Sequence, residues 1–167
     1  MKKRRFFALF LVLGLLVSLL SVPASAFEEI DVDARAALLV EKETGEILYE
    51  KNAHEKNYPA SITKLTVALL VFEAIDAGQL SLDQPITAHE SAFEGLSIYG
   101  STAGIKVGEV LTVEQLLQCM LIVSANEACN ILAEAVCGEG NISQFVQRMN
   151  ERAAALGCEN THYVNTS

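Results

Sequence analysis

The sequence predicts a protein of the α+β class, because a segment with strand signals precedes a run of helical segments. Two apolar runs, residues 36–41 and 46–50, flank a turn that contains Gly45 and predict a β-hairpin. After a polar loop, helical patterns occupy most of the remaining chain. The expected helices span residues 61–77, 113–123, 127–136 and 141–156, and a strand is expected to begin at residues 161–164.

The first 26 residues have the three-part pattern of a secretory signal peptide. Residues 2–5 are basic, residues 6–22 are almost wholly apolar, and Ala24 and Ala26 are the small residues that a signal peptidase recognises. The alternative is an uncleaved membrane anchor, for which the apolar run is slightly short. We therefore expect residues 1–26 to be removed on export, leaving residues 27–167 as one domain.

The charge of the exported part narrows the classes of partner. Removing residues 1–26 takes away four of the 12 basic residues and none of the 21 acidic ones, so the net charge changes from −9 to −13. Such an acidic surface argues against binding to nucleic acid or to anionic lipid. The composition therefore favours a soluble, exported domain.

Ser61 and Lys64 open the first expected helix, which Gly78 is placed to end. The helix carries apolar residues almost all round, so we expect it to be buried on every side. Residues three apart share a helix face, and a neutral lysine there can activate a serine as a nucleophile. The positive helix N-terminus and desolvation favour the neutral amine. The alternative is an N-cap serine beside a solvated lysine.

A second polar group, Ser124-Ala125-Asn126, interrupts two apolar helical runs. Polar residues there are costly unless they are paired or used. Ser124 would add a hydroxyl for proton transfer, and Asn126 an amide that orients Lys64 or a substrate carbonyl. The alternative is a plain helix junction with Asn126 as the cap. Upstream, Thr112 is expected to cap the helix that begins at Val113.

Together these motifs resemble the serine D-alanyl-D-alanine carboxypeptidases of the peptidase S11 family, the low-molecular-mass penicillin-binding proteins. The resemblance rests on Ser61-Ile62-Thr63-Lys64 with its neighbours and on Ser124-Ala125-Asn126. It extends over residues 58–65, 100–104, 116–128 and 145–161, and so over nearly all of the exported part. It implies a DD-peptidase/β-lactamase-like fold, with a helical cluster packed on an antiparallel sheet, and no cofactor or metal.

The resemblance also implies a role for each motif residue. Ser61 would attack the carbonyl between the two terminal D-alanines of a peptidoglycan stem pentapeptide and form an acyl-enzyme. Lys64 would be the base, Ser124 would pass the proton to the leaving D-alanine, and Asn126 would bind the substrate backbone. β-Lactams would acylate Ser61 covalently. The protein would act in cell-wall biogenesis at the extracytoplasmic face of the bacterial membrane, in the periplasmic space or wall.

The family's third motif, Lys-Thr-Gly on a sheet strand, is absent, since no lysine follows Lys106. We therefore expect residues 27–167 to be the N-terminal part of the catalytic domain of a longer protein, with the later sheet strands missing. Alone, this part is expected to be inactive or weakly active. Membrane association would arise only through the missing C-terminal region.

Two alternatives remain open. A class A β-lactamase shares the fold and the first motif, but it normally has aspartate where this chain has Ala125, and it needs a later glutamate for deacylation. A non-catalytic penicillin-sensing or wall-binding module would lack the third motif altogether. Reading the gene beyond Ser167 would separate the enzyme from such a module.

The cysteines and histidines show no spacing suited to a metal ion. Three of the four cysteines lie in apolar helical patterns and are expected to be small buried residues. Export permits disulfides, and the three full pairings of four cysteines stay open. The cysteines are Cys119, Cys129, Cys137 and Cys158, and the histidines are His54, His89 and His162.

Overall fold

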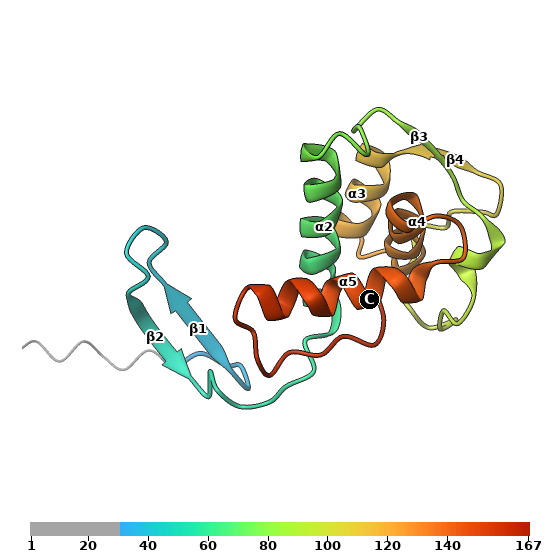
Figure 1. Cartoon of the computed structure of the whole chain (residues 1–167). Helices are drawn as coiled ribbons and strands as arrows, with labels where there is room; N and C mark the ends of the chain where they lie inside the picture. Colours follow the sequence, from blue (N-terminus) through green and yellow to red (C-terminus); the bar gives the residue numbers. More distant parts are fainter. Residues whose placement is uncertain (1–30) are drawn as a thin grey trace, which may run out of the picture. The chain divides into compact units, whose positions relative to one another are not determined.

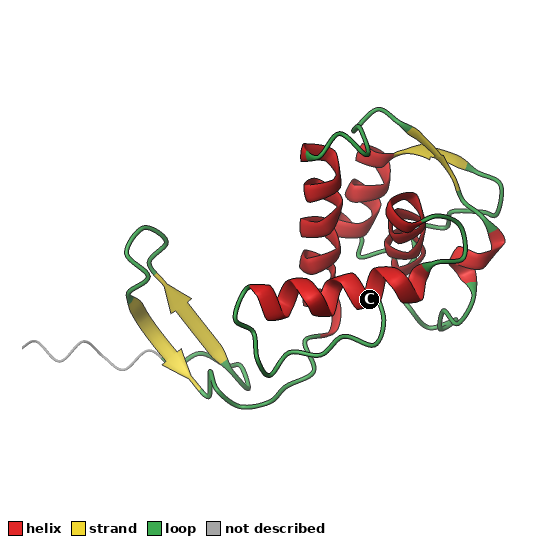
Figure 2. Cartoon of the chain, viewed as in Figure 1, coloured by secondary structure: helices red, strands yellow, loops and turns green. Residues whose placement is uncertain are grey.

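The computed structural model describes residues 31–167, so the expected signal peptide lies outside the described residues. The described chain forms two compact units, which divide between Glu55 and Lys56 (Figure 1). Figure 2 shows that the first contains strands and the second is mostly helical. In chain order the elements are β1 Ala37–Val40, β2 Ile47–Lys51, η1 Ala60–Thr63, α2 Lys64–Asp76, β3 Pro85–Thr87, η2 Glu90–Phe93, β4 Val110–Thr112, α3 Val113–Ile122, α4 Asn126–Cys137 and α5 Ile142–Ala155.

The predicted hairpin is confirmed. Strands β1 and β2 pair antiparallel, with Ala37 opposite Lys51 and a register shift between Leu39 and Val40. The turn closes where the Glu41 amide donates to the Glu46 carbonyl at 2.8 Å. Gly45 has φ +74°, a conformation that few residues other than glycine adopt readily.

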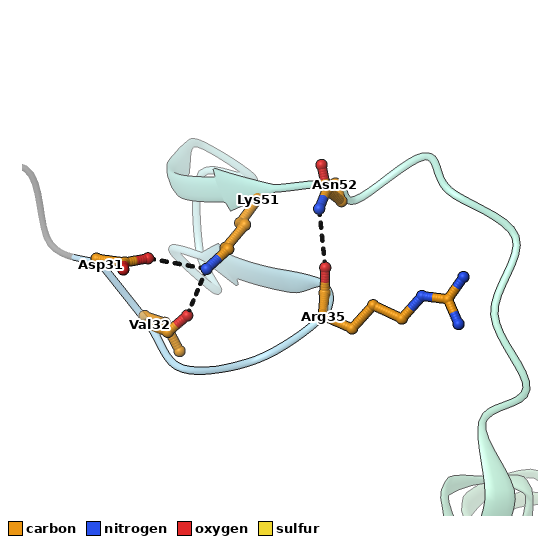
Figure 3. Close-up of polar contacts among 5 residues, drawn as sticks. All are labelled: Asp31, Val32, Arg35, Lys51 and Asn52. Carbon is orange, nitrogen blue, oxygen red and sulfur yellow. Dashed lines mark hydrogen bonds and ion pairs between the residues drawn. The ribbon is translucent and has the colours of Figure 1, made fainter.

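Polar contacts tie the open end of the hairpin to the segment before β1 (Figure 3). The Lys51 ammonium donates to the Asp31 carboxylate at 2.8 Å and to the Val32 carbonyl at 2.7 Å. The Asn52 side chain donates to the Arg35 carbonyl at 2.9 Å. The hydrogen bond from Lys51 lowers the pKa of Asp31, and the same bond raises the pKa of Lys51.

The first helix departs from the prediction in two respects. Its start is a 3₁₀ turn, η1, so Ser61 lies before the α-helix, and α2 begins only at Lys64. The expected burial on every side is wrong, because Leu65 and Phe72 are exposed. Helix α2 packs against α3, α4 and α5, and only the face that these helices contact is buried.

Helix α4 is the centre of the helical unit. It packs against α2, α3, α5, β3 and η2, and an unbroken run of its residues, 127–134, is buried. Helix α3 begins as predicted at Val113, and the hydroxyl of its N-cap Thr112 accepts from the Gln115 amide in a reciprocal capping box. The largest fully buried side chains of the unit include Val67, Val71, Leu116, Met120, Leu132, Phe145 and Met149.

Two small features were not predicted. Strands β3 and β4 pair antiparallel, with Ile86 opposite Leu111, and the 3₁₀ turn η2 lies between them in the chain. Strands of three residues are too short to show alternation in the sequence. Within the described residues, no helix combines the length and apolarity that crossing a membrane requires.

The strand expected at residues 161–164 is wrong. The backbone of Tyr163 pairs with a side chain instead of a strand: its amide donates to Asn150 Oδ1 at 2.7 Å, and its carbonyl accepts from Asn150 Nδ2 at 2.9 Å. An asparagine amide can satisfy both backbone groups of one residue. The segment therefore docks on α5 without forming a sheet.

Candidate active site

Ser61 lies at a strained entry to helix α2. Ala60, the residue before it, has φ +48° in the left-handed region, which costs a non-glycine residue about 1–3 kcal/mol. Ser61 itself is exposed, whereas the following residues Thr63 and Lys64 are buried. The turn thus presents the serine hydroxyl at the surface and directs the lysine inwards.

Lys64 has 3% of its surface exposed, and its amino group is surrounded by oxygen atoms. Its Nζ lies 3.3 Å from Ser61 Oγ, 2.8 Å from Ser124 Oγ, 2.6 Å from the Ser124 carbonyl and 2.7 Å from Asn126 Oδ1. The structure therefore brings together all four residues that the sequence singled out. The solvated lysine of the alternative interpretation is not observed.

The types of these oxygen atoms determine what the amine can do. The Ser124 carbonyl and Asn126 Oδ1 can only accept hydrogen bonds, so two N–H groups of Lys64 are directed at them. The third position of the nitrogen faces the serine hydroxyls. In the charged form this position donates, and in the neutral form it is a lone pair that accepts a hydroxyl proton. Nζ is within reach for proton transfer to and from Ser124 Oγ at 2.8 Å, whereas the 3.3 Å contact with Ser61 Oγ must shorten for direct transfer.

Ser124 is held at the junction of α3 and α4 by its neighbour. Ala125 is fully buried, and its amide donates to the Cys119 carbonyl at 3.0 Å. Ser124 adopts φ +61°, a second left-handed non-glycine residue beside the lysine. This conformation lets both its carbonyl and its hydroxyl contact Lys64, while its Oγ donates to Ser61 Oγ at 2.8 Å. The three polar groups form a closed ring.

Asn126 is the first residue of α4 and not its cap, which is Ala125. Its backbone N–H donates to the Ser101 carbonyl at 2.9 Å. Because Oδ1 faces the lysine, the side-chain NH₂ group is the part of the amide left for a substrate carbonyl.

Sequence reasoning did not identify Glu127 and Gly100, which also border the site. Glu127 is buried beside Asn126, and its carboxylate accepts hydrogen bonds from the loop of residues 102–104. A side chain at Gly100 would meet the Asn126 amide. An acid within an otherwise apolar helical run was the available signal for Glu127, since buried acids need partners.

The four cysteines all lie in the described part of the chain and are free thiols. Only Cys129 is fully buried, and burial raises its pKa to about 12. Cys119 and Cys137 are half-buried and Cys158 is exposed, so the expected burial of the three helical cysteines holds fully for one. Within residues 31–167 no group of three or more His, Cys, Asp or Glu side chains is placed to hold a metal ion.

Residues 23–167 match the model of the peptidase S11 family, D-alanyl-D-alanine carboxypeptidase. The chain belongs to this family, which confirms the resemblance inferred from its motifs. It is 35% identical to D-alanyl-D-alanine carboxypeptidase DacF of Bacillus subtilis, over 89% of this chain and 39% of the relative. It is also 35% identical to DacC of Escherichia coli, over 79% of this chain and 33% of that protein. The chain thus spans well under half the length of these relatives.

Solved structures confirm the fold. D-alanyl-D-alanine carboxypeptidase DacD of Francisella tularensis is 36% identical, with a TM-score of 0.75 over 83% of this chain and 32% of that one. Penicillin-binding protein D2 of Listeria monocytogenes, in its ampicillin-bound form, is 31% identical, with a TM-score of 0.70 over 84% of this chain and 54% of that one. The α+β class and the DD-peptidase fold are therefore established.

Proposed function

We propose that this chain supplies the nucleophile and general base of a serine D-alanyl-D-alanine carboxypeptidase, which removes the terminal D-alanine from peptidoglycan stem pentapeptides. The observation that carries the proposal is the buried Lys64 amine, held between two serine hydroxyls and the Asn126 amide. Membership of the family supports the substrate class. Because the chain spans 39% of the Bacillus relative, the activity is proposed for the whole protein.

Acylation follows from the contacts around Ser61. Lys64 takes the hydroxyl proton as Ser61 Oγ attacks the carbonyl carbon between the two terminal D-alanines. The C–N bond breaks, an ester forms, and the leaving amine receives a proton through Ser124. The Ser124 hydroxyl suits this step, since it lies 2.8 Å from both Ser61 Oγ and Lys64 Nζ. Water then hydrolyses the ester and regenerates the serine.

Asn126 and the backbone of Ser61 would hold the substrate. The NH₂ group of Asn126 donates to a substrate carbonyl, because its Oδ1 is engaged by Lys64. The backbone N–H of Ser61 is one donor to the oxyanion. The resemblance to the family assigns the second donor and the contact to the substrate carboxylate to a Lys-Thr-Gly strand, a motif that residues 1–167 do not contain.

The proposal includes a location and a class of inhibitor. Residues 1–26 act as a signal peptide, and residues 27–167 begin a catalytic domain at the outer face of the bacterial membrane. β-Lactams acylate Ser61 as analogues of the D-alanyl-D-alanine end. The ampicillin-bound form of the Listeria relative supports this class of ligand.

Covalent labelling of the full-length protein by a fluorescent penicillin tests the proposal. The wild-type protein should be labelled, and Ser61→Ala should abolish labelling because no hydroxyl remains to form the ester. Persistent labelling of the variant would remove Ser61 as the nucleophile. The lifetime of the acyl-enzyme with benzylpenicillin separates two enzymes: slow release fits a carboxypeptidase, and fast turnover would identify a β-lactamase.

A further inference from the structure

Glu127 is a buried acid that the proposed chemistry does not use. It lies in the first turn of α4, directly after Asn126, and 3% of its surface is exposed. A carboxylate at a helix N-terminus is favoured by the helix dipole, but its burial needs hydrogen bonds as compensation. The hydrogen-bond partners of Glu127 therefore indicate its structural role.

All the partners of Glu127 Oε1 come from one loop. It accepts from Thr102 Oγ1 at 2.6 Å, from the Ala103 amide at 2.7 Å and from the Gly104 amide at 3.1 Å. Thr102 Oγ1 in turn accepts from the Gly104 amide at 2.8 Å. One carboxylate oxygen thus fixes three successive residues of the loop.

The same loop lies against the side chain of Asn126. A Cβ atom at Gly100 would lie 2.5 Å from Asn126 Nδ2, so the glycine leaves only enough room for the amide. One residue on, the Ser101 carbonyl accepts from the backbone N–H of Asn126 at 2.9 Å, which ties the loop to the start of α4. The backbone of the loop therefore forms the wall that limits where the Asn126 side chain can point.

We propose that Glu127 is a positioning residue, which clamps the loop of residues 100–104 against Asn126 and so fixes the Asn126 amide between Lys64 and the substrate. Glu127 acts through the loop, and the loop acts through Asn126, whose Oδ1 contacts Lys64 Nζ at 2.7 Å. Gly100 is also needed for this positioning, because a side chain there would displace the side-chain amide of Asn126. The inference rests on the proposed function only for its effect on acylation.

The first test substitutes Glu127 in the full-length protein and measures acylation by a fluorescent penicillin. Glu127→Ala should slow acylation on the order of 100-fold, the scale for a misplaced catalytic group. Glu127→Gln should recover most of the rate, because all three bonds end on one oxygen and glutamine keeps one acceptor oxygen. Equal rates for Glu127→Ala and the wild type would overturn the proposal.

A matched control separates positioning from stability. Glu134 is the other buried acid of α4, 5% exposed, and its Oε1 accepts from the Gly140 amide at 2.9 Å. Glu134→Ala should lower the melting temperature without changing the acylation rate. If Glu134→Ala slows acylation as much as Glu127→Ala, the loss is one of stability and the proposal fails.

Gly100→Ala provides an independent variant. Gly100 is not among the glycines with positive φ, so alanine is compatible with its own φ. The cost comes from a Cβ 2.5 Å from Asn126 Nδ2, with a second, less severe contact of 3.1 Å to the Ser97 carbonyl. It should slow acylation in the same way as Glu127→Ala. In an Asn126→Ala background both substitutions should have little further effect, whereas full additivity would show that neither acts through Asn126.

A spectroscopic readout works without any activity. The side-chain NH₂ signals of Asn126 in the NMR spectrum, with selective asparagine labelling, should shift and broaden in Glu127→Ala and return in Glu127→Gln. Unchanged signals would overturn the clamp even in an active enzyme. Failure of the proposed function would give a different result: penicillin would not label even the wild-type protein.

Discussion

The hairpin unit and the helical unit are stabilised by different kinds of interaction. The leucines of the hairpin, Leu38, Leu39 and Leu48, are 56%, 56% and 57% exposed. In the helical unit, Leu116, Leu132 and Phe145 are fully buried. Successive strand residues point to opposite faces, so Leu38 and Leu39 lie on opposite faces of this two-stranded sheet. A two-stranded sheet alone cannot bury such residues.

Polar contacts hold the hairpin where burial does not. Lys51 bonds Asp31 and Val32 at its open end, and Thr44 bonds the Glu41 carboxylate at its turn. Asp31 and Thr44 are exposed and Lys51 and Glu41 are partly exposed, so water competes for these contacts. The candidate site lies in the other unit for a physical reason, because a buried amine with four oxygen contacts needs a packed scaffold to fix each of them.

The largest expected effect contrasts one lysine from each unit. Lys64→Ala should slow acylation of the full-length protein by penicillin by about 10²–10⁴-fold, because the general base is lost. Lys51→Ala, which also removes a lysine with two oxygen partners, should leave the rate unchanged. The measurement is the time course of fluorescent labelling. An equal loss in both variants would show that the hairpin takes part in the chemistry.

A smaller effect concerns the two kinds of leucine. Leu132→Ala should lower the free energy of unfolding by about 2–5 kcal/mol, since it removes a fully buried side chain from α4. Leu48→Ala should cost less than about 1 kcal/mol, because the side chain is largely in water already. Urea unfolding followed by circular dichroism measures both. A Leu48→Ala cost as large as that of Leu132→Ala would mean that the hairpin leucines are covered in solution.

A further effect, seen only in alkaline solution, concerns the thiols of the helical unit. Burial raises the pKa of Cys129 to about 12 from an ordinary value of 9.0. The unfolded chain therefore releases this proton first, so the stability held below about pH 9 is lost between pH 9 and about pH 12. The slope is at most about 1.4 kcal/mol per pH unit. Cys129→Ala should flatten this alkaline loss relative to wild type.

Cys158 is the matched control, because it is exposed near the end of α5. Thiol titration of the folded protein at pH 8 should detect Cys158 rapidly and Cys129 only after unfolding. Rapid reaction of Cys129 would contradict its burial.

The local elements could be predicted where a few neighbouring residues decide them. The hairpin follows from two apolar runs around Gly45, and the start of α3 follows from Thr112, whose hydroxyl and backbone act within one turn. Ser61, Lys64, Ser124 and Asn126 were found from their types and spacing, because proton transfer needs those groups close together. The roles assigned to them remain predictions that the labelling experiments test.

Tertiary structure decided what depends on partners distant in sequence. The exposed face of α2 with Leu65 and Phe72, the pairing of β3 with β4, and the docking of Tyr163 on Asn150 all depend on which elements meet. The contacts of Glu127 are of the same kind, since its loop lies more than twenty residues earlier. The sequence by itself determined the chemical groups of the site and the helices that carry them. Only the packing of α4 against its neighbours determined how the site is held, because burial and long-range hydrogen bonds arise from the assembled unit.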